Sequence, residues 1–286
     1  MYLVLGEPNR QVVEAFTATL QQRNRPVLFL KELTSELDFI WSFNTNQSSS
    51  ALSIDGHNID SNAIRGVLVQ NPLLLDSEPP PEDAVQYAQA EKNAILFAWF
   101  SSLVCPVINR YPVEYWFSPG VALPFWEKWI RDSGLEIAPA ILSNVEAAIK
   151  KFGEALGTGA SYLPFCGSEA YRASTKEDWK GIAKLAAICP VNLTWFIPPL
   201  YAGCVVGKRV FWNRHVSKAI SQCERQLVEI SRAAHLDFVE FHLATNKDLV
   251  YVHRVDPFPK LEPFDGKLRR LIAEELVKYL DSGARS

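Results

Sequence analysis

The sequence lacks the cysteine patterns that build disulfide frameworks and zinc sites. Its cysteines are odd in number and contain no Cys-x-x-Cys pair: they are Cys105, Cys166, Cys189, Cys204 and Cys223. Small secreted domains rely on paired cysteines, and structural zinc needs closely spaced ligands, so neither is favoured. We therefore expect the protein to work in a reducing compartment, the cytoplasm.

Long hydrophobic runs and an excess of one charge are missing as well. The longest apolar stretch, residues 94–108, has about 15 residues, whereas a membrane span needs roughly 20. No basic region stands before an apolar stretch at the start of the sequence, so we expect no secretory signal. The formal net charge of -3 offers no basic surface to nucleic acid. We expect neither a membrane nor a nucleic acid as partner.

A glycine-rich phosphate loop is absent, although the elements that would flank one are present. Apolar residues 2–5 and 27–30 predict two strands, and the spacing of Val13 and Phe16 predicts a helix between them. This order is typical of a parallel sheet whose face the helix covers. Gly6 stands alone after the first strand, so the repeated glycines of a dinucleotide site are missing.

The middle of the chain alternates predicted helices and strands. Its length of 286 residues allows two or three lobes, since single cores stop growing near roughly 250–300 residues. The predicted helices are 124–133, 145–156 and 176–187, and the predicted strands are 137–142, 161–165 and 193–197. Gly134 follows the first of these helices as a terminator. The fold class predicted here is α/β.

The last third of the chain predicts a helix followed by a strand hairpin. Residues 217–234 have helical spacing, and residues 236–243 and 250–256 have the composition of strands. Pro257 and Pro259 then end the second strand. This order makes the C-terminal part of the chain α+β.

Charged residues on the two hairpin strands should lie together. Alternate residues of a strand share a face, so Glu240 lies beside His242 and Arg254 lies beside Asp256. Magnesium prefers carboxylate, water and phosphate oxygens, and a charged arginine cannot bind it. We expect Arg254 and Asp256 to form an ion pair that leaves the hairpin nearly neutral.

Several short motifs occur in an order that resembles one family. Asn109 and Arg110 follow a predicted strand, a Gly-Leu-x-x-Pro sequence occupies 134–139, Val-Val-Gly occupies 205–207, and the hairpin comes last. Together they resemble ATP-grasp proteins of the glutathione-synthetase and peptide-maturation-ligase type. The resemblance implies an ATP-grasp fold with three lobes: an N-terminal pre-ATP-grasp α/β lobe at 1–110, a central small lobe with its linker helix at 111–195, and a C-terminal lobe at 196–286.

The resemblance also implies where a nucleotide and its metal would lie, and this chain departs from the family there. The small-lobe strand, which carries a lysine in the family, has none and includes Leu163. The hinge strand has Trp195 where polar residues are usual. Two of the three acidic positions of the metal hairpin are His242 and Arg254, and Asp256 is the third. We interpret these positions as a degenerate nucleotide site with no catalytic residue and no metal.

Further cations and polar residues are candidates for other parts of the site. Arg214 is the best remaining phosphate-facing position that the resemblance implies. Asn109, Arg110 and Lys208 are candidates for the substrate or partner site. Structural explanations stand beside these: Asn109 and Arg110 can close a turn, and His242, like His253, can be a hydrogen-bonded strand residue.

Two functions follow from the resemblance. In the first, the protein has lost ATP and magnesium chemistry, needs no cofactor, and acts as a binding or regulatory subunit for a protein or peptide. In the second, it is a divergent carboxylate–amine ligase that uses ATP and magnesium and works through an acyl-phosphate, with Arg214, Arg254 and Lys208 meeting the phosphate charge. A homodimer is compatible with both functions.

Overall fold

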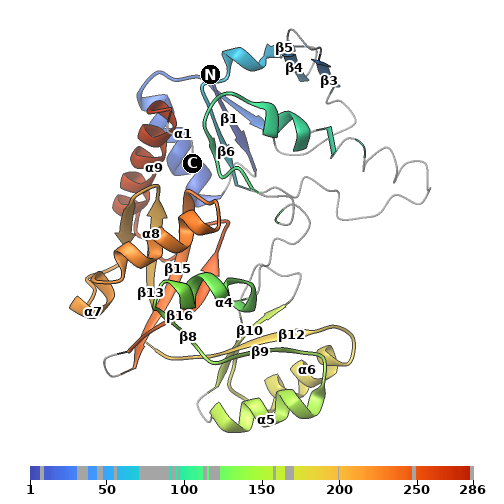
Figure 1. The fold of residues 1–286 in the computed structure, drawn as a ribbon, viewed down its shortest axis with the longest axis vertical. Coiled ribbons are helices and arrows are strands. Elements are labelled where there is room, and N and C mark those ends of the chain that lie inside the picture. The colour runs from blue at the N-terminus through green and yellow to red at the C-terminus, as the bar shows by residue number, and fades with distance from the viewer. Residues whose placement is uncertain are drawn as a thin grey trace. The chain divides into compact units, whose positions relative to one another are not determined.

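The structure is a computed structural model (Figure 1), and it falls into two compact units. It describes residues 1–6, 10–30, 38–43, 48–54, 57–70, 91, 94–95, 97–111, 115, 123–156, 159–164, 171–198, 200–246 and 249–283. The first unit comprises Met1–Pro112 and Arg269–Ser286, and the second comprises Val113–Leu268. None of the described helices is both long and apolar enough to cross a membrane.

The first unit contains the predicted strand, helix and strand. Strands β1 (Tyr2–Leu5) and β2 (Val27–Leu30) are parallel neighbours joined by α1 (Gln11–Gln22). Strands β6 (Gly66–Val69) and β7 (Val107–Ile108) extend the sheet in the order β2-β1-β6-β7. All of β1 is buried because a central parallel strand is covered on both faces. The predicted parallel sheet is confirmed.

A separate antiparallel sheet follows β2 in the chain. It consists of β3 (Asp38–Phe43), β4 (Ser48–Ile54) and β5 (His57–Asp60). The short 3-10 helix η1 (Ser61–Ala63) leads from it to β6, and the carboxylate of Asp60 caps that helix by accepting from the N–H of Asn62.

The C-terminal helix packs on the N-terminal sheet. Helix α9 (Gly266–Asp281) brings Leu280 against Gly66 of β6, where a Cβ would lie 3.0 Å from the Leu280 side chain. The Tyr2 hydroxyl donates to Asp281, and Arg25 pairs with the same carboxylate at 3.3 Å. Burial and the Asp281 hydrogen bond raise the pKa of Tyr2 to about 12. The two ends of the chain are thus joined in one unit.

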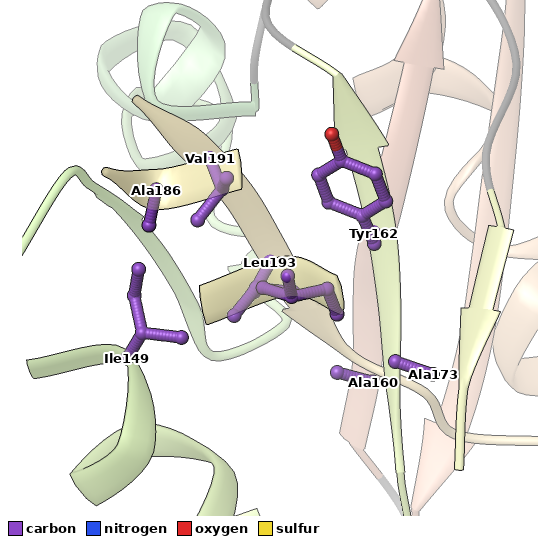
Figure 2. Close-up of a cluster of buried hydrophobic side chains, with 8 residues drawn as sticks. Ile149, Ala160, Tyr162, Ala173, Ala186, Val191 and Leu193 are labelled. Atoms are coloured by element: carbon purple, nitrogen blue, oxygen red, sulfur yellow. The ribbon is translucent and has the colours of Figure 1, made fainter. Parts of the chain in front are cut away.

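The second unit contains two sheets, which we call the small sheet and the large sheet. The small sheet has the order β11-β10-β12-β9, with all neighbours antiparallel. Its strands are β9 (Ala140–Ser143), β10 (Ala160–Pro164), β11 (Tyr171–Ala173) and β12 (Val191–Trp195). Helices α5 (Glu146–Leu156) and α6 (Lys176–Ala186) cover one face. Figure 2 shows the apolar side chains buried under them, which include Tyr162, Leu193 and Ile149.

The large sheet has the order β14-β13-β15-β16-β8. Its strands are β8 (Glu136–Ile137), β13 (Tyr201–Val206), β14 (Arg209–Trp212), β15 (Phe238–Asn246) and β16 (Leu249–Asp256). Helix α4 (Leu123–Asp132) precedes β8. Gly134 follows the end of this helix, and its φ of 83° suits a glycine terminator. The predicted hairpin is confirmed as β15 and β16.

The helical segment at 217–234 is two helices and not the single helix predicted. Helix α7 (Lys218–Ser221) is separated from α8 (Glu224–Ala233) by a turn at Gln222 and Cys223. The buried residues Ile220, Cys223, Leu227 and Ile230 keep a helical period through that turn, so the period could not reveal it. His235 ends α8 with a φ of 56°, and its N–H bonds to the carbonyl of Arg232.

Two helical glycines test how α5 packs against α6. A Cβ at Gly181 in α6 would meet nothing within 4 Å. Gly181→Ala should therefore raise the free energy of unfolding by about 0.5–1 kcal/mol, because alanine loses less backbone entropy in a helix. A Cβ at Gly153 in α5 would lie 2.8 Å from the ring of Trp179. Gly153→Ala should lower the free energy of unfolding by about 1–3 kcal/mol. Urea unfolding measures both, and stabilisation by Gly153→Ala would contradict this packing.

Candidate functional site

Four charged or titratable side chains form a rectangle on the large sheet. Glu240 of β15 is the register partner of Asp256 in β16, and His242 is the partner of Arg254. Directly opposite residues of an antiparallel pair share a face. We call these four residues the hairpin quartet. The face is the one away from α8, because Trp212, on the other face, donates to Glu224 of that helix at 2.8 Å.

Each carboxylate of the quartet is held by one base and one backbone N–H. Nε2 of His242 lies 3.0 Å from Oε1 of Glu240, and Nη2 of Arg254 lies 2.8 Å from Oδ2 of Asp256. The N–H of Leu261 donates to Oε2 of Glu240 at 3.2 Å, and the N–H of Phe258 donates to Oδ1 of Asp256 at 2.9 Å. The predicted Arg254 and Asp256 ion pair is confirmed. The partnership of Glu240 with His242 is an additional finding.

The two carboxylates of the quartet do not titrate alike. Burial raises the pKa of Glu240, but the hydrogen bond and charge of His242, the Leu261 N–H and Arg254 together leave that pKa below its ordinary value. Burial raises the pKa of Asp256, Arg254 opposes the increase, and Glu240 adds to it, so this pKa stays above its ordinary value. Their surroundings therefore shift the pKa values of the two carboxyls in opposite directions.

The quartet does not fit a magnesium ion. All four carboxylate oxygens already accept from a base or a backbone N–H. Magnesium needs carboxylate or water oxygens in near-octahedral geometry, and the fixed charge of Arg254 opposes a second cation. Within the described part of the chain, no group of three or more His, Cys, Asp or Glu residues could hold a metal.

His253 occupies a bulge in β16 beside the quartet. Leu243 pairs with Val252 and His242 pairs with Arg254, so His253 is the extra residue of β16. Its side chain is 4% exposed, and neither ring nitrogen makes a hydrogen bond of normal geometry among the described residues, although the backbone of Trp195 lies nearby. Burial, then the positive charges of His242 and Arg254, lower the pKa of His253 to about 4. The ring is therefore neutral at pH 7.

An aromatic contact joins the small sheet to this part of the large sheet. The ring of Phe196, just after β12, meets the ring of His253 edge-on, with centroids 6.1 Å apart. The guanidinium of Arg172 stacks over the Phe196 ring, with Cζ 4.7 Å from the ring centroid. Arg172 belongs to β11 and was missed in the sequence, because it stands outside the strand where the family resemblance implies a cation.

The sequence-predicted residues of the small sheet lie close to this contact. Leu163 is in β10 opposite Asn192, and its side chain is outside the described part of the chain. Trp195 is opposite Ala160, a member of the helix-covered core, so the strand pleat places Trp195 on that side. The next residue, Phe196, makes the contact with the large sheet. Both assignments to a nucleotide site remain predictions.

The two candidate cations at either end of β14 differ in their relation to the quartet. Asn213 bonds to Ala202, the register partner of His242, so Arg214 lies level with the quartet. Its guanidinium stacks over the ring of Tyr201 at 4.6 Å and donates to the Leu200 carbonyl. Lys208 lies in the turn between β13 and β14, level with Phe238 and about 13 Å along the strand from His242. The structure therefore does not place Lys208 beside the quartet.

Asn109 and Arg110 belong to the first unit and have structural contacts there. Asn109 is 1% exposed and donates to the Tyr111 hydroxyl at 3.0 Å. Arg110 donates to four carbonyl oxygens, those of Phe100, Ser101, Leu103 and Cys105. These bonds satisfy carbonyls at and after a helix end. They support the turn-closing explanation, and a role in substrate binding stays a prediction.

Comparison with known proteins identifies the fold. No model of a known protein family and no curated protein matches the sequence. Among solved structures, macrocyclase MdnC from Microcystis aeruginosa MRC, bound with precursor peptide MdnA, matches with a TM-score of 0.74 at 14% identity, covering 99% of this chain and 100% of that chain. A RiPP-associated ATP-grasp ligase from Chryseobacterium gregarium, in complex with ADP and a leader and core peptide, matches with a TM-score of 0.73 at 13% identity, covering 99% and 97%. The chain has the ATP-grasp fold of peptide-maturation ligases, as its motif order indicated.

The neighbours overturn one expectation and weaken another. ATP-grasp ligase PsnB, with a TM-score of 0.72 at 17% identity over 98% of this chain and 97% of that chain, was solved with a precursor variant, Mg and ADP. The expectation of no cofactor, which rested on the hairpin residues, is therefore wrong for this fold. Loss of catalysis, the first of the two functions, finds no support in these neighbours. The neighbours were solved with peptides, which agrees with the expected protein or peptide partner. The cytoplasmic location stays a prediction.

The buried His253 should make stability depend on pH. Its pKa is about 4 in the folded protein and 6.5 for a free side chain. The unfolded chain therefore binds a proton first, and the stability due to neutral His253 is present above pH 6.5 and lost as pH falls towards 4. From about pH 7.5 to about pH 5 the wild type should lose about 2 kcal/mol more than His253→Leu. Urea unfolding at both pH values measures this, and the exposed His215→Gln serves as control. Equal losses in wild type and His253→Leu would refute the burial.

Reversing the two bases of the quartet should create a metal site. His242→Asp with Arg254→Glu places four carboxylates on one rectangle, so Mn²⁺ should bind and raise the unfolding temperature, while the wild type shows no such response at this site. A cation at 100 times its dissociation constant adds about 2.7 kcal/mol. The control Arg270→Glu adds a carboxylate beside Glu274 on an exposed helix face. If Mn²⁺ raised the unfolding temperature of the double variant no more than that of this control, the register of β15 and β16 would be contradicted.

Proposed function

We propose that the protein is an ATP-dependent ligase that joins a carboxylate to an amine on a peptide. The observation that carries the proposal is the extent of the structural match, which spans 99% of this chain with TM-scores of 0.74 and 0.73 and includes both sheets of the second unit. The two proteins matched were solved with peptides, one of them also with ADP. At 13–14% identity the match supports the fold, and the activity is our inference.

The proposed reaction has two displacement steps. A carboxylate oxygen of the peptide attacks the γ-phosphorus of ATP, and the bond from that phosphorus to the β-phosphate oxygen breaks. ADP departs, and the peptide now carries an acyl-phosphate. The amine nitrogen then attacks the acyl carbon, inorganic phosphate leaves, and the nitrogen loses a proton. Such transfers depend on positioning and on neutralising phosphate charge. The chain contributes by binding and orienting the two substrates.

The quartet gives this site an unusual charge pattern. The bases are its more exposed members, with side-chain exposures of 16% for His242 and 23% for Arg254 against 3% for Glu240 and 11% for Asp256. A ligand at this face meets the imidazole and the guanidinium first, and anionic oxygens suit the guanidinium. Because the quartet does not fit magnesium, we assign no step to a metal held by these residues. A binding subunit without ligase activity is what would remain if the proposal failed.

Nucleotide binding and ligation can be measured separately. Millimolar ATP with Mg²⁺ should raise the unfolding temperature of the wild-type protein, since a ligand of the native state stabilises it. Incubation with ATP, Mg²⁺ and a library of peptides that each contain glutamate and lysine should give ATP-dependent products lighter by one water, detected by mass spectrometry. The same mixture with ADP in place of ATP is the control. No thermal response and no dehydrated product would sink the proposal.

A further inference from the structure

The small sheet carries a polar row on the face away from its helices. Ser161 of β10 is the register partner of Arg172 on one side and of Thr194 on the other. Neighbours of these residues in the three strands, Ala160, Ala173 and Leu193, lie in the core that α5 and α6 cover, and Figure 2 labels all three. By the strand pleat, the row points the other way. A guanidinium and two hydroxyls thus stand in line across three strands, and all can donate hydrogen bonds.

Among the described residues, Arg172 differs from Arg254 in having no acidic partner. Its guanidinium stacks over the Phe196 ring, with Cζ 4.7 Å from the ring centroid. Arg254, by contrast, is neutralised by Asp256 at 2.8 Å. Stacking on an aromatic ring orients a guanidinium and leaves its N–H edge available. No acidic group in the described part of the chain therefore compensates the positive charge of Arg172.

A buried polar atom on the same face of the small sheet has no hydrogen-bond partner among the described residues. Asn192, two residues before Thr194 in β12, is 3% exposed, and its Oδ1 accepts no hydrogen bond there. Buried polar groups in native proteins nearly always have partners. An acceptor in this position suits a ligand that also carries a hydrogen-bond donor.

Building on the proposed function, we infer that Arg172 binds the phosphate groups of the nucleotide. The strand at 161–164, where the family resemblance implies a lysine, has none, and Arg172 brings a cation to the same face from the neighbouring strand. A guanidinium can bind two phosphate oxygens in parallel, and the Ser161 hydroxyl stands next to it. Arg172 is thus a binding residue that contacts phosphate and not the base.

The experiment compares ADP, which carries phosphate charge, with adenosine, the uncharged nucleoside. Dissociation constants for ADP and for adenosine, with Mg²⁺ present, are measured by calorimetry for wild type, Arg172→Gln and Arg172→Lys. Arg172→Gln should weaken ADP binding about tenfold or more and leave adenosine binding unchanged, because a charge-assisted contact to phosphate is lost. Arg172→Lys should recover part of the ADP affinity because the charge is restored.

The matched control is Arg209→Gln. Arg209 is also exposed and stacked on an aromatic ring, that of Phe211 at 5.1 Å, but it lies in β14 level with Phe238, away from His242. It should bind ADP as the wild type does, and thermal unfolding confirms that each variant is folded. Equal ADP affinity in Arg172→Gln and wild type, or equal weakening of ADP and adenosine, would overturn the inference alone. A wild type that binds neither ligand would overturn the proposed function and this inference with it.

Discussion

The burial of two carboxylates side by side on neighbouring strands governs the chemistry of the hairpin. Glu240 and Asp256 are directly opposite one another, 2% and 8% exposed. Buried like charges are unfavourable unless each is paired and hydrogen-bonded. His242 and Arg254 supply the pairing from the same two strands, and backbone N–H groups at 258 and 261 complete it. The segment after β16 is thereby tied to the hairpin, and the bases are left as the parts that a ligand can reach.

This arrangement changes which groups the site presents to a ligand. A hairpin that holds magnesium attracts phosphate through the metal, whereas this one offers an imidazole and a guanidinium. In the small sheet, Arg172 adds a guanidinium stacked on the ring of Phe196. The two sheets of the second unit thus meet at the contact of Phe196 with His253, and Arg172 lies on the same aromatic ring. The inference that this guanidinium binds phosphate rests on that position.

The sequence predicted the elements of the fold better than the contacts within the site. The parallel start of the chain, the terminator at Gly134 and the hairpin strands follow from apolar period and from glycine and proline chemistry. The Arg254 and Asp256 pair was predictable because it lies within one strand. Arg172 was missed because its relation to β10 depends on cross-strand register, which alternation alone does not fix.

Helix boundaries show the same limit in another form. The buried positions of α7 and α8 keep helical spacing across the turn between them, so the sequence predicts one continuous helix. The functional weight of His253 was equally hidden, since only the structure shows that it is the extra residue of a bulge and that its ring meets Phe196. Neither feature has a composition signal of its own.

The bulge at His253 determines which of the residues 254–256 in β16 lie on the face of the hairpin quartet. If His253 paired with His242 in a regular ladder, Arg254 would fall opposite Phe241 and Val255 opposite Glu240, so Arg254 and Asp256 would exchange sides with Val255. Strand length, and not only residue identity, therefore determines the polarity of this surface. An extra residue that the strand did not absorb as a bulge would turn the guanidinium to the face of α8 and a valine to the quartet face, so chains of this fold can gain or lose such a surface by a change in spacing alone.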